Sequence, residues 1–405
     1  MKKPTQKVPQ IRFPEFSDKW ELTCLNEILE ESKVKNKDLK YTKSDVLSVS
    51  GDYGVVNQIE HLGRSYAGAS VHNYGLVEVG DIVYTKSPLK GNPFGIIKVN
   101  KNKPGIVSTL YAIYKTKNNK LDECFIDYYF SLEDNTNRYL RPLVRKGAKN
   151  DMKINNDYVL SESIYIPQTK EQIKISQFLE LIDKKLILLD VKLNDLIEYK
   201  KGLLQNVFSQ VVRFKNDNGT KFPDWEELLA GKVFKSVSNK EHNGDLTVLA
   251  ATQENGMVPR ASIGIEIKSS EKSIKSYKIV EKGDFVISLR SFQGGIEYSN
   301  YYGICSPAYT ILKPKIKINH IFFKFYFKKE SFIERLSKTV VGIRDGKQIS
   351  YSAFAGLKLQ LPSFEEQCRI ADLITNIDSQ IKNTEEQLNN TKEYKKALLQ
   401  KMFCN

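Results

Sequence analysis

Two long stretches of the chain carry the hydrophobic spacing of a coiled coil. In the first, apolar residues follow one another in alternating steps of four and three, at Ile175, Leu179, Ile182, Leu186, Leu189, Leu193, Leu196, Leu203 and Val207. The second stretch keeps the same register, at Ile370, Ile374, Ile377, Ile381, Thr384, Leu388, Thr391, Leu398 and Met402. A lysine, Lys200 or Lys395, interrupts each pattern, and each stretch starts just after a proline, Pro167 or Pro362. This spacing predicts two helices of about 40 residues, each roughly 60 Å long.

The two stretches are copies of each other. The string EYKKGLLQ at residues 198–205 returns as EYKKALLQ at 393–400, and 16 of the 43 residues from 166 to 208 are identical at an offset of 195. The similarity continues upstream: residues 146–154 correspond to 341–349, 122–130 to 319–327, 77–84 to 280–287, and RFPEF at 12–16 to KFPDW at 221–225. Unrelated amphipathic helices would not share this much sequence, so the pattern indicates an internal duplication.

The order of the segments predicts how the two helices lie. The second half of the chain leaves the C-terminal end of the first helix and enters the N-terminal end of the second. An antiparallel pair needs only a turn there, whereas a parallel pair would need a connection back along the whole rod. We therefore expect an antiparallel pair with pseudo-two-fold symmetry.

The sequence outside the helices is typical of short strands joined by turns. In GLVEVGDIVYTKS at 75–87 and YKIVEKGDFVISLRS at 277–291, a Gly-Asp turn separates two apolar runs. Residues 122–140 and 319–337 each have the pattern of a helix. The predicted fold class is α+β, with two similar mixed α/β domains separated by a long antiparallel two-helix coiled coil. The predicted parts are residues 1–165, 166–213, 214–360 and 361–405.

Composition narrows the classes of partner. The chain has 62 Lys and Arg against 48 Asp and Glu, a net charge of +14, so a polyanion such as nucleic acid or an acidic membrane surface is expected. No run of about 18 apolar residues and no apolar N-terminal signal occurs, which favours a soluble, cytoplasmic protein without membrane spans. The five cysteines and four histidines are scattered without ligand spacing, so no metal site is expected.

Polar and basic residues gather in loops that follow predicted strands in both halves. Arg and Lys can reach phosphates or guanine edges, and Asn and Gln can pair with adenine. A solvated loop is the simpler interpretation for any single residue, but matched positions in the two halves favour contact with DNA. The DNA-binding candidates are Lys86, Ser87, Lys90, Asn92, Lys146, Lys149, Asn150 and Lys153 in the first half, and Arg290, Ser291, Gln293, Arg344, Lys347 and Gln348 in the second.

No catalytic motif is complete. NPFG at 92–95 is similar to an amino-methyltransferase motif, but it lacks the second proline and no glycine-rich methyl-donor loop precedes it. GIRDGKQ at 342–348 is one residue short of a phosphate-binding loop and lacks the Ser or Thr that would hold magnesium. Glu198 and Glu393 lie within the heptads, without the acidic partner that a nuclease site needs. We therefore expect a non-catalytic chain with no metal and no cofactor of its own.

Two bodies, each followed by an I/L-P-x-x-x-E-Q-x-x-I pattern and a heptad helix ending in EYKK-x-LLQ, resemble the DNA-specificity subunit of a type I restriction–modification enzyme. The resemblance covers nearly the whole chain. It implies two target-recognition domains that each read half of a bipartite double-stranded DNA site, and helices that set the spacer between the halves. It also implies two methyltransferase subunits docked on the helices and restriction/motor subunits that join them. S-adenosylmethionine, ATP and magnesium would then be bound by those partners.

Two identical methyltransferase subunits would need similar docking surfaces, which would explain why the helices resemble each other more than the bodies do. Exposed helix positions are therefore candidates for partner contacts, with helix-to-helix packing as the alternative. These candidates are Glu171, Gln172, Glu198, Tyr199 and Lys201, and their copies Glu366, Gln367, Glu393, Tyr394 and Lys396. Two other functions stay open: a stand-alone two-headed DNA-binding regulator without enzyme partners, and an enzyme with degenerate motifs.

Overall fold

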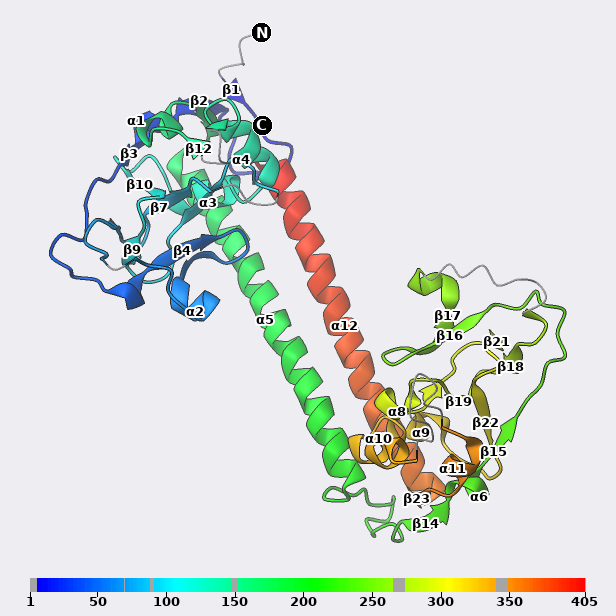
Figure 1. Ribbon diagram of the computed structural model, residues 1–405. Coiled ribbons are helices and arrows are strands. Elements are labelled where there is room, and N and C mark those ends of the chain that lie inside the picture. The colour runs from blue at the N-terminus through cyan, green and yellow to red at the C-terminus, as the bar shows by residue number, and fades with distance from the viewer. Residues whose placement is uncertain are drawn as a thin grey trace. The chain divides into compact units, whose positions relative to one another are not determined.

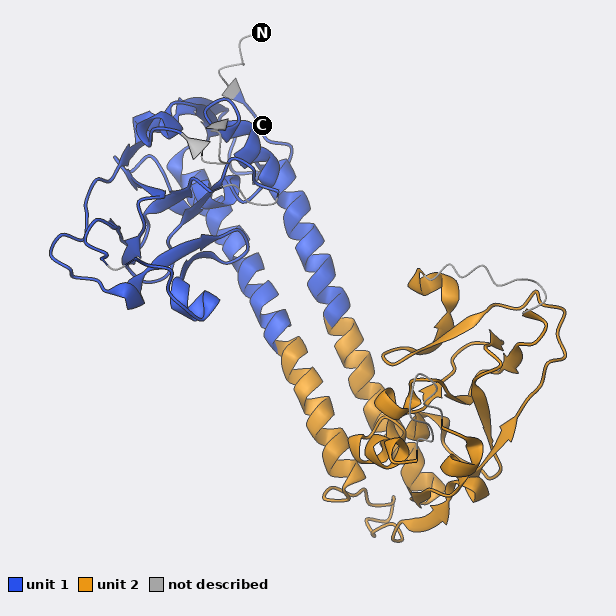
Figure 2. Ribbon diagram, viewed as in Figure 1, with its two compact units in different colours: residues 1–191, 385–405 blue, residues 192–384 orange. Residues whose placement is uncertain are grey.

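The chain divides into two compact units (Figure 2). The computed structural model describes residues 6–68, 70–87, 91–146, 152–264, 274–339 and 349–404. Unit 1 comprises residues 1–191 and 385–405, and unit 2 comprises residues 192–384, so each unit contains one body and part of each long helix. These boundaries fall within the helices, and the division into four parts stays a prediction.

The two long helices are α5 (Thr169–Phe208) and α12 (Phe364–Met402) (Figure 1). Each begins two residues after the proline that the sequence marks as a start, which confirms that prediction. Every predicted seam position on both helices, Lys200 and Lys395 included, is buried or half-buried. The heptad pattern therefore identifies the faces along which the helices pack.

Within each unit the two helices run in opposite directions, as predicted. In unit 1, Ile175 and Leu179 of α5 share a core with Leu398 and Met402 of α12, and farther along α5, Asp183 pairs with Lys395. In unit 2, Lys200 pairs with Asp378 at 2.6 Å, and the following turns of α5 share a core with the earlier turns of α12, around Ile370 and Ile374. Rising numbers along α5 therefore meet falling numbers along α12.

The body of unit 1 is built on antiparallel sheets. One sheet has the order β1-β2-β13, with β1 (Gln6–Lys7), β2 (Trp20–Cys24) and β13 (Ser163–Ile166). A second has the order β3-β10-β7-β8, with β3 (Leu29–Glu31), β10 (Tyr111–Thr116), β7 (Ile82–Thr85) and β8 (Ile96–Val99). Shorter ladders pair β4 (Leu47–Ser50) with β5 (Gly54–Asn57), β6 (Gly75–Val77) with β9 (Gly105–Val107), and β11 (Arg145–Lys146) with β12 (Met152–Lys153). The helical segments are α1 (Leu25–Ile28), η1 (Lys43–Asp45), α2 (Gln58–Leu62), α3 (Glu123–Tyr129), α4 (Glu133–Leu140) and η2 (Asp157–Leu160).

The body of unit 2 repeats this plan. Its main sheet has the order β15-β22-β19-β20, with β15 (Phe234–Val237), β22 (Thr310–Pro314), β19 (Phe285–Ile287) and β20 (Glu297–Tyr298). The other ladders pair β14 (Glu226–Leu229) with β23 (Lys358–Leu361), β16 (Leu249–Thr252) with β17 (Gly256–Pro259), and β18 (Lys278–Val280) with β21 (Gly303–Cys305). The helical segments are α6 (Ala230–Val233), η3 (Arg260–Ile263), α8 (Ser291–Gly294), α9 (His320–Tyr326), α10 (Glu330–Ser337) and α11 (Tyr351–Ala355). The mixed fold class and the duplication of the body are confirmed.

The predicted Gly-Asp turns precede the central strands β7 and β19. Gly80 and Gly283 have φ angles of +91° and +99°, a left-handed conformation that glycine adopts without steric cost. The carboxylates of Asp81 and Asp284 each accept a hydrogen bond, at 2.8 Å, from the amide three residues earlier. The turns therefore start matching strands in both units.

The single helix predicted for residues 122–140 is wrong, because two helices occupy this range. The side chains of Asn135 and Thr136 donate to the carbonyls of Tyr129 and Phe130, at 3.0 and 2.6 Å, and so satisfy the last carbonyls of α3. Residues 319–337 likewise form two helices, α9 and α10. The break allows aromatic residues of both short helices to face the same core, as Phe323, Phe327 and Phe332 do in unit 2.

Candidate nucleic-acid interface and partner surface

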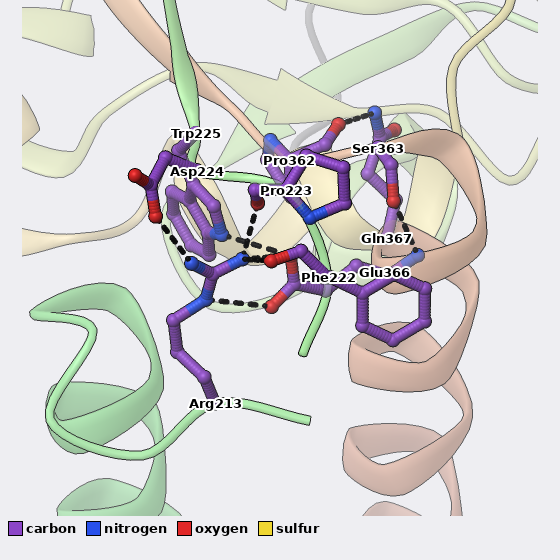
Figure 3. Close-up of polar contacts among 9 residues, drawn as sticks. All are labelled: Arg213, Phe222, Pro223, Asp224, Trp225, Pro362, Ser363, Glu366 and Gln367. Atoms are coloured by element: carbon purple, nitrogen blue, oxygen red, sulfur yellow. Dashed lines mark hydrogen bonds and ion pairs between the residues drawn. The ribbon is translucent and has the colours of Figure 1, made fainter. Parts of the chain in front are cut away.

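A buried carboxylate fastens the start of α12 to the segment that enters the body of unit 2 (Figure 3). Glu366 is 0 % exposed, and its carboxylate accepts two hydrogen bonds from Arg213, at 3.1 and 2.8 Å, and one from the indole of Trp225, at 3.1 Å. Arg213 also pairs with Asp224 at 3.2 Å and donates to the carbonyl of Pro223 at 2.6 Å. The hydrogen bonds with Glu366 raise the pKa of Arg213 above its usual value. We call this set of contacts the clasp of unit 2.

Unit 1 has the same clasp. Glu171 near the start of α5 accepts from Arg12 at 2.7 and 2.6 Å and from the indole of Trp20 at 3.3 Å. The two-bond geometry between guanidinium and carboxylate is the strong form of a charged hydrogen bond. In their contacts Arg12 therefore corresponds to Arg213 and Trp20 to Trp225, whereas the segments RFPEF and KFPDW, paired residue by residue, place Arg12 opposite Lys221 and Phe16 opposite Trp225.

The residue after each clasp glutamate ties the helix to the body. Gln172 accepts from the amide of Asp122 at 2.9 Å and donates to the carbonyl of Pro167 at 2.8 Å. Its copy Gln367 accepts from the amide of Asn319 at 2.9 Å and donates to the carbonyl of Pro362 at 3.0 Å. The glutamine thereby links the start of the long helix to the start of α3 or α9.

Four of the predicted partner residues make these contacts and are therefore buried. Glu171, Gln172, Glu366 and Gln367 are at most 1 % exposed, so the expectation that they lie on the helix surface is wrong. The E-Q pair recurs because each body must be joined to its helix. The remaining six candidates, Glu198, Tyr199, Lys201, Glu393, Tyr394 and Lys396, are exposed, and their contact with partners stays a prediction.

The two lysines that interrupt the heptads form equivalent ion pairs. Lys200 pairs with Asp378 in unit 2, and Lys395 pairs with Asp183 in unit 1. Under the 195-residue offset Asp183 corresponds to Asp378 and Lys200 to Lys395, so each pair is the image of the other. The lysine nitrogens also lie over aromatic rings, 5.1 Å from Phe325 and 5.4 Å from Tyr128. A charged pair within an apolar seam favours one register over its neighbours.

The outer faces of the helices are less alike than the resemblance implies. On α5, Leu181, Ile187, Leu188 and Val191 are between 51 and 69 % exposed. The corresponding residues of α12 are Asn376, Lys382, Asn383 and Glu386. The expectation of similar surfaces is therefore wrong for this part of the helices.

The described DNA-binding candidates lie where the sequence places them, after matching strands. Lys86 and Ser87 follow β7, and Arg290 follows β19 at the corresponding position. Ser87, Arg290 and Gln293 are exposed, and Lys86 and Asn92 are half-buried. Lys146 and Lys153 belong to β11 and β12, and Lys90, Lys149, Asn150, Arg344, Lys347 and Gln348 lie outside the described residues.

Ser291 does not lie on the surface. It is 0 % exposed, and its hydroxyl accepts a hydrogen bond from the amide of Ser288 at 2.8 Å. That hydroxyl holds the turn between β19 and α8. The prediction of an exposed, DNA-facing side chain is wrong for this residue.

Both bodies share a hairpin that the sequence patterns above do not predict. The β4–β5 hairpin leads into α2, and the β16–β17 hairpin leads into η3; both helical segments end at a left-handed glycine, Gly63 or Gly264. In unit 1 the exposed side chains of Tyr53 and His61 border a cavity of about 490 Å³ beside this hairpin. The similar spacing of glycines in the two halves, nine residues from Gly54 to Gly63 and eight from Gly256 to Gly264, is the signal that could have revealed it.

The described residues contain no group of three or more His, Cys, Asp or Glu side chains that could hold a metal ion. No helix within the described ranges is long and apolar enough to cross a membrane.

Comparisons with known proteins agree in sequence and in structure. The sequence profile described as the type I restriction modification DNA specificity domain matches residues 17–199 and 224–393. A Methanocaldococcus jannaschii sequence assigned as the type I restriction enzyme MjaX specificity subunit is 22 % identical over 410 aligned positions, and the match covers 95 % of this chain and 93 % of that protein. The type I restriction enzyme MjaVIII specificity subunit of the same organism is 27 % identical over 204 aligned positions, and the match covers 48 % of this chain and 46 % of that protein.

Two crystal structures share the fold. The S subunit of a type I restriction-modification system from M. genitalium has a TM-score of 0.55 at 14 % identity, and the match covers 98 % of this chain and 99 % of that one. The HsdS subunit from Thermoanaerobacter tengcongensis has a TM-score of 0.54 at 15 % identity, with 98 % of both chains covered.

Proposed function

Because the chain belongs to the type I restriction modification DNA specificity family, we propose that its two units each read half of a bipartite DNA target and that its paired helices seat methyltransferase subunits. The chain is a specificity subunit with two target-recognition domains, and subunits of this kind recognise DNA without catalysing a reaction. The bipartite target and the docked methyltransferase subunits are proposals that go beyond membership of this family.

The duplication of the junctions carries the proposal. Both clasps, both glutamine links and both seam ion pairs use the same residue types. The loops after the central strands differ, with Lys86 and Ser87 in one unit and Leu289 and Arg290 in the other. A shared frame with dissimilar loops suits a protein that reads two different base sequences from one scaffold.

The DNA contacts proposed for residues within the described ranges are those of Lys86, Ser87, Asn92, Lys146, Lys153, Arg290 and Gln293. The chain has a net charge of +14, which suits a phosphate-rich partner. The cytoplasm is the proposed location, since that is where host DNA would be met. S-adenosylmethionine, ATP and magnesium would bind to the partner subunits, and the methyl transfer and DNA cleavage would take place there.

Co-expression with the methyltransferase encoded beside this chain tests the proposal. Native mass spectrometry should find the methyltransferase bound, and methylation of host DNA should map to two short sequences around an unread spacer. A chain that binds DNA but never retains a methyltransferase would instead be a stand-alone regulator.

A second experiment tests the spacer. Deleting the matched heptads 188–194 and 383–389 shortens each helix by about 10 Å, which corresponds to about three base pairs of DNA. The distance between the two methylated half-sites should fall by that amount, or binding should be lost. An unchanged spacer with retained binding would show that the helices do not set it.

A further inference from the structure

A groove in unit 2 separates the last turns of α5 from the junction of α9 and α10. Its volume is about 610 Å³. Its floor is apolar, formed by Ile197, Leu204, Phe208 and Phe325, and four lysines and a single glutamate, Glu330, line its edge, so the edge carries a net positive charge. Ile197 is 43 % exposed, so part of this floor faces solvent.

The four lysines differ in the partners of their ammonium groups. Lys200 pairs with Asp378. Lys328 donates to Glu297 at 2.7 Å and to the carbonyls of Gln253 and Gly294, so its three donors are all engaged.

The other two lysines have no carboxylate partner among the described residues. Lys329 donates to the carbonyl of Phe208 at 3.0 Å, and burial lowers the pKa of this lysine. Lys201 is exposed on α5 and lines the same groove. A carboxylate brought between them would satisfy donors that the chain itself leaves available, and it would offset the desolvation of Lys329.

The chemistry of the groove favours a protein segment over DNA. An apolar floor gains free energy by covering hydrophobic side chains, whereas a sugar–phosphate backbone brings charge and little apolar surface. The groove also opens on the EYKKGLLQ segment, whose exposed residues form the partner surface under the proposed function. An amphipathic segment with acidic residues matches both the floor and the edge.

Unit 1 lacks this groove chemistry although its helix motif is the same. Lys395, Lys396, Leu399 and Phe403 repeat the α5 residues. The positions of Lys328 and Lys329, however, are taken by Ser131 and Leu132, because α3 and α4 correspond to α9 and α10 residue by residue. Leu132 packs against the core of unit 1.

From this difference we infer that the unit 2 groove docks an acidic, amphipathic segment of a methyltransferase subunit, and that the two docking sites of the chain are therefore unequal. The inference rests on the proposed function. Docking at unit 2 depends on charge and weakens with salt, whereas docking at unit 1 depends less on salt. Raising the salt concentration should release one methyltransferase before the other.

The test uses the full chain and the methyltransferase subunit encoded beside it, followed by native mass spectrometry and a salt titration of binding. Lys201→Glu, Lys329→Glu and the milder Lys329→Gln change the groove, and Lys192→Glu, at an exposed position of α5 outside the groove, is the matched control. We expect the two glutamate variants to weaken binding of one methyltransferase at least about tenfold and to flatten its salt dependence. The control should change binding of that subunit by less than about twofold.

Each outcome has one meaning. Wild-type binding and salt dependence in Lys201→Glu and Lys329→Gln, both folded by circular dichroism, would overturn this inference alone. Loss of DNA affinity by the partner-free variants, with methyltransferase binding intact, would assign the groove to DNA and also overturn it. A wild-type chain that retains no methyltransferase would overturn the proposed function itself.

Discussion

Replacing Glu366 by glutamine should destabilise unit 2, because the clasp depends on a buried negative charge. The carboxylate is 0 % exposed and accepts from Arg213 and Trp225 at 2.8 to 3.1 Å. Glutamine keeps the shape but turns one acceptor into a donor that faces the guanidinium. At least one of the three donors then loses its partner.

The size of the destabilisation depends on the partners that Arg213 keeps in the variant. Removing one partner of a buried ion pair costs about 3–5 kcal/mol. Arg213 still has Asp224 at 3.2 Å and the carbonyl of Pro223 at 2.6 Å, so we expect the lower end, about 3 kcal/mol. With a urea dependence of about 2 kcal/mol per molar, the unfolding midpoint of unit 2 should fall by about 1–2 M.

The chain carries a convenient reporter for this measurement. It has two tryptophans, and each belongs to one clasp. In a Trp20→Phe background, the fluorescence of Trp225 follows unit 2 alone during urea unfolding. The neighbouring Glu365 is exposed, and Glu365→Gln should shift the stability by less than about 0.5 kcal/mol. If Glu366→Gln unfolds at the same urea concentration as Glu365→Gln, the clasp does not stabilise the unit.

Three further predictions concern unit 2. Burial raises the pKa of Asp284 to about 6 from its usual 3.8, so the ionised carboxylate destabilises the fold above pH 6; this penalty shrinks as the pH falls below 6 and is lost near 3.8. Asp284→Asn should therefore raise the melting temperature more at pH 8 than at pH 5, and an equal shift at both would contradict this. Lys200→Glu opposite Asp378 should cost about 1 kcal/mol in chemical denaturation, and adding Asp378→Lys should restore most of it; simple additivity in this cycle would mean that the seam pair does not couple. Gly256→Ala would place its Cβ 2.3 Å from a backbone oxygen of β20, whereas Gly54→Ala at a similar φ meets nothing within 4 Å. The left-handed backbone should destabilise both variants by about 1–2 kcal/mol. Thermal denaturation should show a larger loss of stability only for Gly256→Ala.

The sequence allowed the long-range plan to be predicted wherever one local pattern dictates the structure. A heptad spacing requires a helix with one apolar face, and an internal repeat requires two bodies of the same fold, so α5, α12 and the two sheets followed. The lysines in the heptads looked like interruptions. They lie in the seam because each meets an aspartate of the opposite helix, a contact between residues 178 or 212 positions apart in the chain.

The clasps could not be predicted, because a single residue type gives no hint of its distant partner. Glu171 lies in the first turn of a helix, where an acidic residue is ordinarily exposed and favoured by the helix dipole. Its burial depends on Arg12, 159 residues away in the chain. Ser291 could not be placed for the same reason, because a serine hydroxyl can also hold a tight turn by bonding a nearby backbone group, as it does here with the amide of Ser288.

The clasps have a consequence for how such a protein can change. In each unit the chain enters the body beside the arginine and leaves it beside the glutamate, and those two residues bind each other. The residues between these two points therefore form an insert whose two ends are held together. The length and sequence of this insert can change during evolution without moving the long helix to which it is attached. New loops can therefore arise while the helices and the clasps stay the same.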